Sequence, residues 1–136
     1  MRDQGVNAVL MGGDALIDKQ FAAIAGPLAE GSLFTFAPDP RKKAAAAAII
    51  KKFKDKGIDP DGYTLYSYAA FQIWSEAVAR AKTTDAMKVA ATIKAGGWDT
   101  VLGHITFTPK GDITLIDYVV YRRDKDGNYA ELPASQ

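Results

Sequence analysis

The apolar positions of the first part of the chain change their period twice. Residues 6–11 form an apolar, β-favouring run that stops at Gly12 and Gly13, and this predicts a short buried strand that opens into a glycine turn. Residues 17–25 then repeat apolar side chains at helical spacing up to a Gly-Pro pair, which favours a short amphipathic helix. Residues 32–36 again have the composition of a strand. The pattern therefore predicts a strand, turn, helix and strand in that order.

The middle of the chain has the pattern of helices. Asp39 followed by Pro40 is typical of a helix start, because aspartate caps the first turn and proline fits its first position. An apolar stripe runs through residues 46–53 among lysines, and a turn-forming cluster occupies residues 59–62. Residues 65–81 are apolar at nearly every position, which predicts a helix that is covered on more than one side.

The last third of the chain changes from helical to strand-like spacing. A further helix, capped by Thr83 or Thr84, is expected to end at a Gly-Gly pair. Residues 100–107 and 113–121 then have strand composition, and a final short strand is expected at 129–132. Together these elements predict an α/β layered fold in which helices flank a mostly parallel sheet. Ligands of such sheets lie beyond the carboxyl ends of the strands.

Composition and charge exclude several kinds of partner. The chain is 48% hydrophobic and carries a formal charge of +1, which suits a globular core and offers no basic face for nucleic acid. The same balance argues against a polybasic membrane anchor. The longest apolar run, residues 44–50, is far shorter than the about 20 residues of a transmembrane helix. No signal-peptide pattern follows Met1, so we expect any export signal to lie outside these residues.

The sequence offers no metal, cofactor or catalytic motif. It contains no cysteine, which excludes disulfides and thiolate sites, and its single histidine, His104, is expected to be structural. The aspartates of the C-terminal part lack the spacing of a calcium loop and are expected in turns. Neither a nucleophile elbow nor a phosphate-binding glycine loop occurs. We therefore expect no cofactor, no metal site and no enzymatic activity.

The segment from Gly12 to Asp14 is the first candidate for ligand binding. A strand is expected to end there, glycines let a backbone approach a ligand closely, and Asp14 presents a carboxylate at the rim. A carboxylate that faces a ligand amine makes a charge-assisted hydrogen bond. Asp14 is also suited to capping a helix that begins near Ala15, a role that aspartate takes very often. The residues themselves leave both interpretations open.

Tyr63 is the second candidate. It opens an aromatic cluster around the start of the long helix, and such a stripe is usually core. Tyr63 differs from the others because it precedes the helix and directly follows the turn, where a ring is able to line the apolar part of a ligand site.

Five blocks of the sequence, in order, resemble one protein family. The first is an apolar strand that ends in Gly12-Gly13-Asp14. The blocks are Gly5-Val6-Asn7-Ala8-Val9-Leu10-Met11-Gly12-Gly13-Asp14, Ala29-Glu30-Gly31, Tyr68-Ala69-Ala70-Phe71-Gln72, Thr100-Val101-Leu102-Gly103 and Phe107-Thr108-Pro109-Lys110-Gly111-Asp112. In their order and spacing these blocks resemble the C-terminal portion of type I periplasmic solute-binding proteins of the branched-chain amino acid (Leu/Ile/Val) ABC-transporter family.

The resemblance implies a fold and a division into lobes. The expected fold is the type I periplasmic-binding-protein fold, a Rossmann-like layered sheet with flanking helices, present only as a C-terminal fragment. Residues 1–37 correspond to the end of the second lobe, and residues 38–115 to the helical part of the first lobe with the start of a hairpin. Residues 116–136 correspond to strands that return to the second lobe.

The resemblance also implies a function. The intact protein is expected to be the periplasmic substrate-binding component of an ABC importer, which captures an amino acid or a similar amine-bearing solute in an interlobe cleft and delivers it to a membrane permease. The resemblance implies that Asp14 binds the ligand's amino group and that the backbone at Gly13 lies close to the ligand. It also implies that Tyr63 lines the pocket for the ligand's side chain. The residues that discriminate between ligands are expected partly in the absent N-terminal half.

Two alternatives stay open beside the transport function. The same fold serves in ligand-sensing regulatory domains, where closure is detected by a protein partner. The chain is also open to interpretation as an assembly-prone fragment without ligand activity, because sheet edges and apolar faces that normally meet missing partners favour self-association. The expected partners are therefore the ligand, the missing N-terminal half, the permease and a second copy of this chain.

Overall fold

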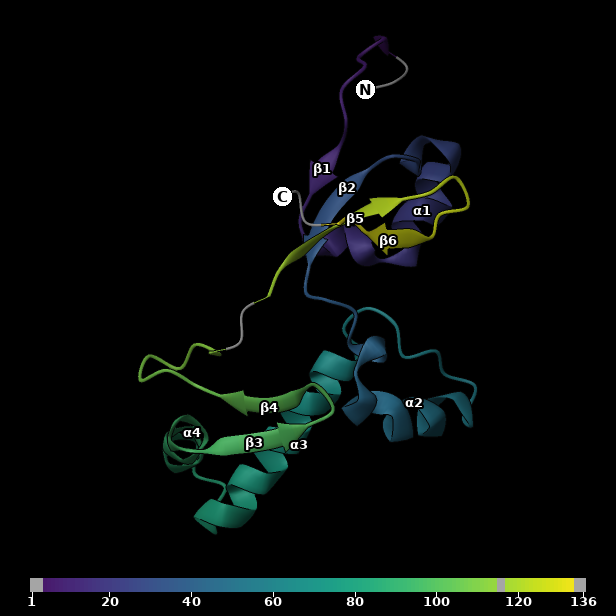
Figure 1. Ribbon diagram of the computed structural model, residues 1–136. Coiled ribbons are helices and arrows are strands. Elements are labelled where there is room, and N and C mark those ends of the chain that lie inside the picture. The colour runs from purple at the N-terminus through teal and green to yellow at the C-terminus, as the bar shows by residue number, and fades with distance from the viewer. Residues whose placement is uncertain (1–3, 115–116, 134–136) are drawn as a thin grey trace. The chain divides into compact units, whose positions relative to one another are not determined.

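The structure, a computed structural model, describes residues 4–114 and 117–133 and divides the chain into two compact units. Unit 1 comprises Met1–Pro38 and Asp117–Gln136, and unit 2 comprises Asp39–Ile116 (Figure 1). The chain thus leaves unit 1 and returns to it. The assignment of residues 1–37, 38–115 and 116–136 to family lobes stays a prediction, and residues 1–3, 115–116 and 134–136 lie outside the described part.

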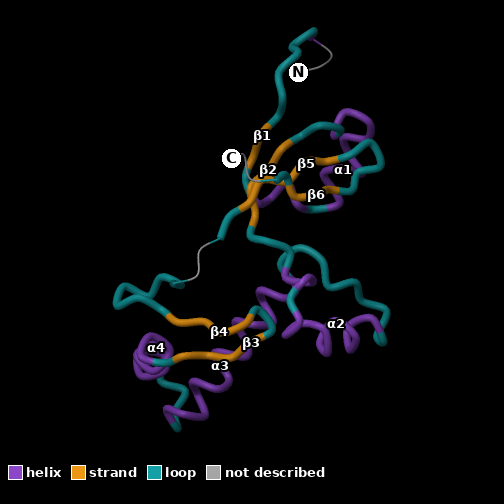
Figure 2. The backbone as a smooth tube through the Cα atoms, viewed as in Figure 1, coloured by secondary structure: helices purple, strands orange, loops and turns teal. Residues whose placement is uncertain are grey.

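A four-stranded mixed sheet forms unit 1. Its strands, in the order in which they pair, are β1 (Met11–Gly12), β2 (Leu33–Phe36), β5 (Val119–Arg123) and β6 (Tyr129–Glu131) (Figure 2). β1 pairs with β2 in parallel, and the other two pairs are antiparallel. The expected mostly parallel sheet is therefore wrong for the described part of this unit. The short turn between β5 and β6 imposes one antiparallel pairing, and the other joins β2 to β5, which are far apart in the sequence.

The strand expected over residues 6–11 is shorter and more exposed than its composition suggests. Only Met11 and Gly12 pair with β2, opposite Leu33 and Phe34. The side chains of Val9 and Met11 are 62% and 57% exposed. β1 is an edge strand of the sheet, so an apolar run typical of a strand buried on both faces stands largely in solvent.

Aromatic side chains fill the inner face of the sheet in unit 1. Phe34 lies opposite Tyr121 in the β2–β5 register, and their rings stack with centroids 5.4 Å apart. Tyr129 of β6 meets both rings edge-on, each at 5.4 Å. The Tyr121 hydroxyl donates a hydrogen bond of 3.1 Å to the carbonyl of Ala37, which satisfies its polar end.

The helix expected over residues 17–25 is divided into two pieces. The 3₁₀ helix η2 (Asp14–Ile17) precedes α1 (Lys19–Ala25), and a further 3₁₀ helix, η3 (Gly26–Ala29), follows it. Asp18 separates η2 from α1, and its carboxylate caps α1 by accepting a 2.8 Å hydrogen bond from the backbone N–H of Gln20. The predicted end of the helix at the Gly-Pro pair is confirmed, since α1 stops where Gly26 adopts a φ of +54°.

Unit 2 is mainly helical. Its helical elements are η4 (Pro40–Lys42), η5 (Ala44–Ala46), α2 (Ala47–Lys54), α3 (Thr64–Ala81) and α4 (Ala86–Ala95). None of the helices in the described residues is both long enough and apolar enough to cross a membrane. Every fourth residue of α3 from Leu65 to Ala77 is buried, whereas Phe71 and Trp74 are 70% and 50% exposed. The expected covering of α3 on more than one side is thus wrong within the described residues.

A two-stranded hairpin packs with these helices and corrects a prediction. β3 (Gly97–Thr100) and β4 (Gly103–Thr106) are antiparallel, so the single strand expected over residues 100–107 contains a turn. The Thr100 hydroxyl shapes this turn: it donates to the carbonyl of Gly103 at 2.9 Å and accepts from the N–H of Leu102 at 3.0 Å. Gly103 has a φ of +97°, which glycine adopts without strain.

Two further boundaries differ from the sequence predictions. Asp85, and neither Thr83 nor Thr84, is the N-cap of α4, and its carboxylate accepts a 3.0 Å hydrogen bond from the N–H of Lys88. The strand expected over residues 113–121 begins later, at β5, although Ile113 forms an isolated bridge with Phe107. Positions 115 and 116 of that prediction lie outside the described residues.

A charged cluster fixes the start of unit 2. Asp39 is the N-cap of η4, as the sequence predicts for a helix start, and accepts from the N–H of Arg41 at 2.9 Å. The Arg41 guanidinium lies 2.8 Å from the carboxylate of Asp39 and 3.3 Å from that of Asp61. Partial burial by itself raises the pKa of Asp39, but the hydrogen bonds and charge of Arg41 outweigh burial and hold this pKa below its ordinary value of 3.8.

Replacement of Asp39 by Asn separates charge from capping, because asparagine caps a helix about as well as aspartate. A carboxylate with a lowered pKa stabilises the fold above its unfolded pKa and loses this contribution as the pH falls through the folded value. We expect Asp39→Asn to lower the free energy of unfolding at neutral pH by about 1 kcal/mol, the scale of a partly exposed ion pair.

Urea denaturation of both proteins across pH measures this difference. It should vanish well below pH 3.8, where the wild-type carboxylate is protonated. The exposed Asp55, paired with Lys51 one helical turn away, provides a control, since Asp55→Asn should change stability much less. A stability difference between wild type and Asp39→Asn that is the same at every pH would contradict the charge argument.

Candidate functional site

Gly13 and Asp14 lie where β1 ends in unit 1. Gly13 is the N-cap of η2 in an extended conformation, and Asp14 is the first residue of that helix. Both residues are exposed. The carboxyl end of a strand next to a helix start is the common location of ligand sites in α/β folds. The position of Asp14 thus agrees with the one expected from the sequence.

Gly12 lies against the side chain of Leu16. A Cβ atom built on Gly12 would lie 2.6 Å from Cδ1 of Leu16, because η2 folds back over the end of β1. The N–H of Leu16 donates a 3.2 Å hydrogen bond to the carbonyl of Gly13, which closes this turn. A Cβ on Gly13 would meet nothing within 4 Å, so the backbone at Gly13 is open to close approach.

The structure assigns helix capping in this segment to residues other than Asp14. The N-cap of η2 is Gly13, and the N-cap of α1 is Asp18. Asp14 lies inside the first turn of η2, where a negative charge is favourable beside the exposed N–H groups. The alternative that Asp14 serves as the cap of a helix beginning near Ala15 is therefore not the observed arrangement. Ligand binding by Asp14 stays a prediction.

Tyr63 belongs to unit 2 and is therefore described apart from Asp14. It is the N-cap of α3, and its carbonyl accepts a 2.9 Å hydrogen bond from the N–H of Ser67. The predicted turn before it is present, with Gly62 at a φ of +54°. The side chain of Tyr63 is 46% exposed, so part of the ring is accessible to a solute.

Polar contacts hold the turn that presents Tyr63. The carbonyl of Asp61 accepts hydrogen bonds from the hydroxyl and the N–H of Thr64, at 2.8 and 3.2 Å. The carboxylate of Asp61 accepts from the N–H of Gly62 at 2.9 Å and lies beside the guanidinium of Arg41. The charged cluster at the start of unit 2 thus also fixes the start of α3, and with it the backbone of Tyr63.

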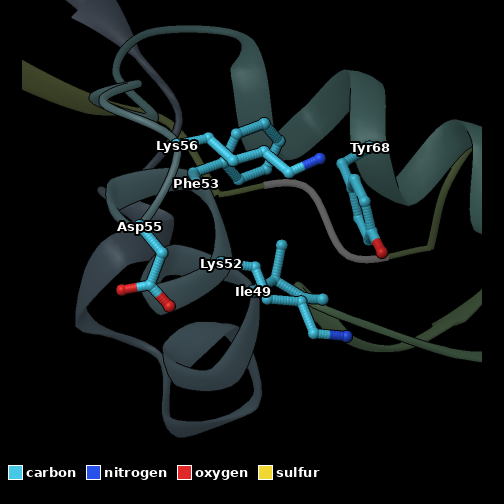
Figure 3. Close-up of a pocket in the computed structure, with 6 residues that line it drawn as sticks. All are labelled: Ile49, Lys52, Phe53, Asp55, Lys56 and Tyr68. Carbon is cyan, nitrogen blue, oxygen red and sulfur yellow. The ribbon is translucent and has the colours of Figure 1, made fainter.

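A pocket within unit 2 lies between α2 and α3 and has a volume of about 480 Å³. Figure 3 shows the side chains of both helices around it. Apolar and aromatic groups form its base, where the rings of Phe53 and Tyr68 meet edge-on at 6.0 Å. The lining residues are Ile49, Lys52, Phe53, Asp55, Lys56 and Tyr68, and none of them is among the ligand-binding residues expected from the sequence.

The charges of this pocket suit an amine-bearing ligand poorly. Its single carboxylate, Asp55, already accepts from the ammonium group of Lys51 at 2.8 Å. Lys52 and Lys56 add two positive charges, which repel a second ammonium group. The carboxylate of this pocket is therefore engaged by Lys51 and lies among lysines, which disfavours binding of a ligand ammonium group there.

The single histidine lies on the hairpin of unit 2. Nδ1 of His104 lies 2.7 Å from a carboxylate oxygen of Asp99, its cross-strand neighbour, and both side chains are exposed. Across residues 4–114 and 117–133 we find no group of three or more histidine, cysteine or acidic side chains arranged to hold a metal ion. His104 has the geometry of an ordinary surface pair.

Known proteins resemble this chain over almost its entire length. Residues 1–128 match the family model described as periplasmic binding protein. The Leu/Ile/Val-binding protein homolog 1 of Brucella suis is 45% identical over 132 residues, which cover 95% of this chain and 36% of the relative. An amino acid binding protein of Pseudomonas aeruginosa is 39% identical over 135 residues, which cover 98% of this chain and 36% of the relative.

A solved structure agrees with the fold. A leucine-binding protein from Thermotoga maritima superposes with a TM-score of 0.80 at 24% identity, and the match covers 97% of this chain and 38% of that protein. The chain thus spans a little over a third of the length of the relatives it matches. The fold is that of the type I periplasmic binding proteins, as the sequence predicted. Because the family model matches 128 of the 136 residues, the chain belongs to the periplasmic binding protein family.

Proposed function

We propose that this chain is part of the substrate-binding component of an ABC importer. The intact protein captures an amino acid or a similar small amine-bearing solute in the periplasm and hands it to a membrane permease, without catalysing a reaction. Family membership supports a solute-binding role. The Brucella relative, named for leucine, isoleucine and valine binding, supports an amino acid as the solute.

The observation that carries the proposal is the exposed Asp14 at the carboxyl end of β1, after two glycines. A carboxylate in this position accepts hydrogen bonds from a ligand ammonium group, and such charge-assisted bonds are about twice as strong as neutral ones. Gly13 leaves room for the ligand backbone, because no atom occupies the space that a side chain would fill. Tyr63 stays a separate candidate in unit 2, where its 46% exposure leaves it accessible to an apolar group of a ligand.

The proposal includes a second part of the protein that this chain does not supply. The chain covers 36% of the Brucella relative. We propose that an N-terminal portion provides the groups that bind the ligand carboxylate and discriminate between side chains. Ligand binding is therefore to be measured on the full-length protein that contains this chain.

Asp14→Ala and Asp14→Asn should weaken binding of L-leucine or L-valine to the full-length protein by about 2 kcal/mol or more, because the ligand ammonium loses its charged partner. Isothermal titration calorimetry measures the dissociation constants.

Asp126→Asn is a matched control in the same unit. Asp126 lies in the β5–β6 turn with its carboxylate 65% exposed, and this variant should bind like the wild type. An unchanged dissociation constant in the Asp14 variants would remove Asp14 from the site. If the wild-type protein gives no heat with any amino acid, the transport proposal itself fails.

The exposed apolar positions favour self-association of the chain on its own. Val9 precedes the edge strand β1 and Met11 is its first residue, and both are exposed. Phe71 and Trp74 line a shallow apolar hollow on α3. Edge strands and apolar faces of this kind are typical sites of association between chains. We therefore propose that the 136-residue chain forms dimers or larger assemblies when its N-terminal portion is absent.

Light scattering coupled to size-exclusion chromatography tests this proposal. The isolated chain should have a mass above that of a monomer, and Val9→Lys should lower it, because a charge directly before the edge strand β1 opposes pairing with another chain. Ile24→Lys is the matched control, since Ile24 is 85% exposed on α1 and away from the strand edge. A monomeric wild-type chain would argue against self-association.

A further inference from the structure

One buried arginine contacts the segment that carries Asp14. Arg123 lies on β5 in unit 1 and is 1% exposed. Its guanidinium donates hydrogen bonds to three backbone carbonyls: that of Gly127 at 2.6 Å, that of Asp18 at 3.0 Å and that of Leu16. Two of these three carbonyls belong to the end of η2 and its junction with α1.

Aromatic rings enclose the same guanidinium. Its carbon lies 5.5 Å from the ring centroid of Phe21, 5.4 Å from that of Phe34 and 5.5 Å from that of Tyr129. These rings come from α1, β2 and β6, so the cation is held by the helix and by the strands on either side of β5. Cation–π contacts strengthen when water is excluded, which favours one fixed position of the guanidinium.

The turn that presents Asp14 is fixed from both ends. On one side, Gly12 is paired into the sheet through β1. On the other, the Leu16 carbonyl is held by Arg123, while the Leu16 side chain packs against Gly12. Gly13 and Asp14 are the exposed residues between these two anchors.

We propose that Arg123 is a positioning residue for ligand binding: by holding the carbonyls of Leu16 and Asp18, it fixes η2 so that Asp14 presents its carboxylate to the solute amine. The inference rests on the proposed function. Burying a charge is expensive, and an apolar side chain of similar volume often packs equally well. A buried arginine with such contacts instead gives a defined backbone geometry, as a precise binding site requires.

Arginine suits this role better than lysine for a geometric reason. The planar guanidinium directs several N–H groups at once and reaches carbonyls of two separate segments, the end of η2 and the β5–β6 turn, whereas a lysine ammonium acts as a compact point charge. Arg123→Lys thus keeps the positive charge and most of the aliphatic side chain but loses the planar set of N–H donors. Arg122→Lys is the matched control, because Arg122 is the exposed neighbour on the same strand.

Hydrogen exchange of the 136-residue chain, followed by NMR or mass spectrometry, tests whether Arg123 holds η2 closed. The N–H groups of Leu16 and Asp18 donate to the carbonyls of Gly13 and Ala15 and so report on opening of η2. In Arg123→Lys they should exchange about tenfold faster than in wild type, because the turn opens more easily once one charged hydrogen bond to its carbonyls is lost. Amides of unit 2 and the Arg122→Lys control should keep wild-type rates. Unchanged exchange at Leu16 and Asp18 would overturn the proposal.

Binding to the full-length protein tests the consequence for the ligand. The probes are L-leucine and 4-methylpentanoate, which has the same carbon skeleton without the ammonium group. Arg123→Lys should weaken leucine binding by about tenfold and 4-methylpentanoate binding by less than about twofold, because the amine contact alone is misplaced. Equal losses for both probes would mean a general structural role and would overturn the proposal.

A double variant separates this inference from the proposed function. If Arg123 acts through Asp14, adding Asp14→Asn to Arg123→Lys should lower leucine affinity less than it does in wild type; additive losses would overturn the inference. If the wild-type protein binds neither probe, the proposed function fails, and the exchange rates still decide whether Arg123 fixes the turn.

A milder variant covers the case in which Arg123→Lys does not fold. Phe21→Leu removes one ring beside the guanidinium while keeping an apolar side chain at that position. Exchange at Leu16 and Asp18 should then rise by about threefold, the scale of one cation–π contact. Unchanged exchange in Phe21→Leu would count against the proposal.

Discussion

The register between β2 and β5 is the constraint on which unit 1 depends. It places Phe34 opposite Tyr121 and turns Arg123 toward the same inner face, under η2 and α1. A shift by one residue would send Arg123 to the outer face and bring the exposed Arg122 inside, because side chains alternate along a strand. The three backbone carbonyls that now accept from Arg123 would lose their donor. The geometry of the turn at Asp14 is thus a consequence of a pairing between two segments that are far apart in the sequence.

In unit 2, a polar cluster rather than aromatic packing fixes the backbone of the candidate residue, Tyr63. Its core is formed by the buried face of α3 and by the hairpin, where Trp98 is fully buried and its indole N–H donates to the carbonyl of Ile93 at 3.0 Å. At the N-terminal end of α3, ion pairs stabilise the structure instead, since Arg41 binds Asp39 and Asp61 just before Tyr63. The backbone of Tyr63 is therefore fixed by a polar cluster, and its ring is left accessible.

Local signals in the sequence predicted much of this structure, and signals that depend on distant neighbours did not. The cap at Asp39, the stop at Gly26 and the extent of α3 were correctly predicted, because capping, positive φ and apolar spacing act within a few residues. Asp39 caps only the 3₁₀ helix η4, however, and the α-helix of this region begins at Ala47. The turn at Thr100 was missed, since strand composition does not reveal that a hydroxyl closes a hairpin. Arg123 was missed as well. In an alternating strand a charged residue is expected in solvent, and only the tertiary fold shows the aromatic and carbonyl surroundings that bury it.

Two elements, β1 and α3, expose apolar residues that their sequence pattern predicts to be buried. Both β1 and α3 carry the apolar pattern of elements covered on two sides, and in the described residues each is covered on one side only, which leaves Met11 and Phe71 exposed. Sequence patterns record the environment in which a segment is stable, so this excess of apolar positions implies more covering surface than the described residues provide. The chain spans 36% of the length of the relatives that it matches. The exposed apolar positions of β1 and α3 therefore offer surface that the proposed N-terminal portion would cover. Without that portion, a second copy of the chain would cover the same surface.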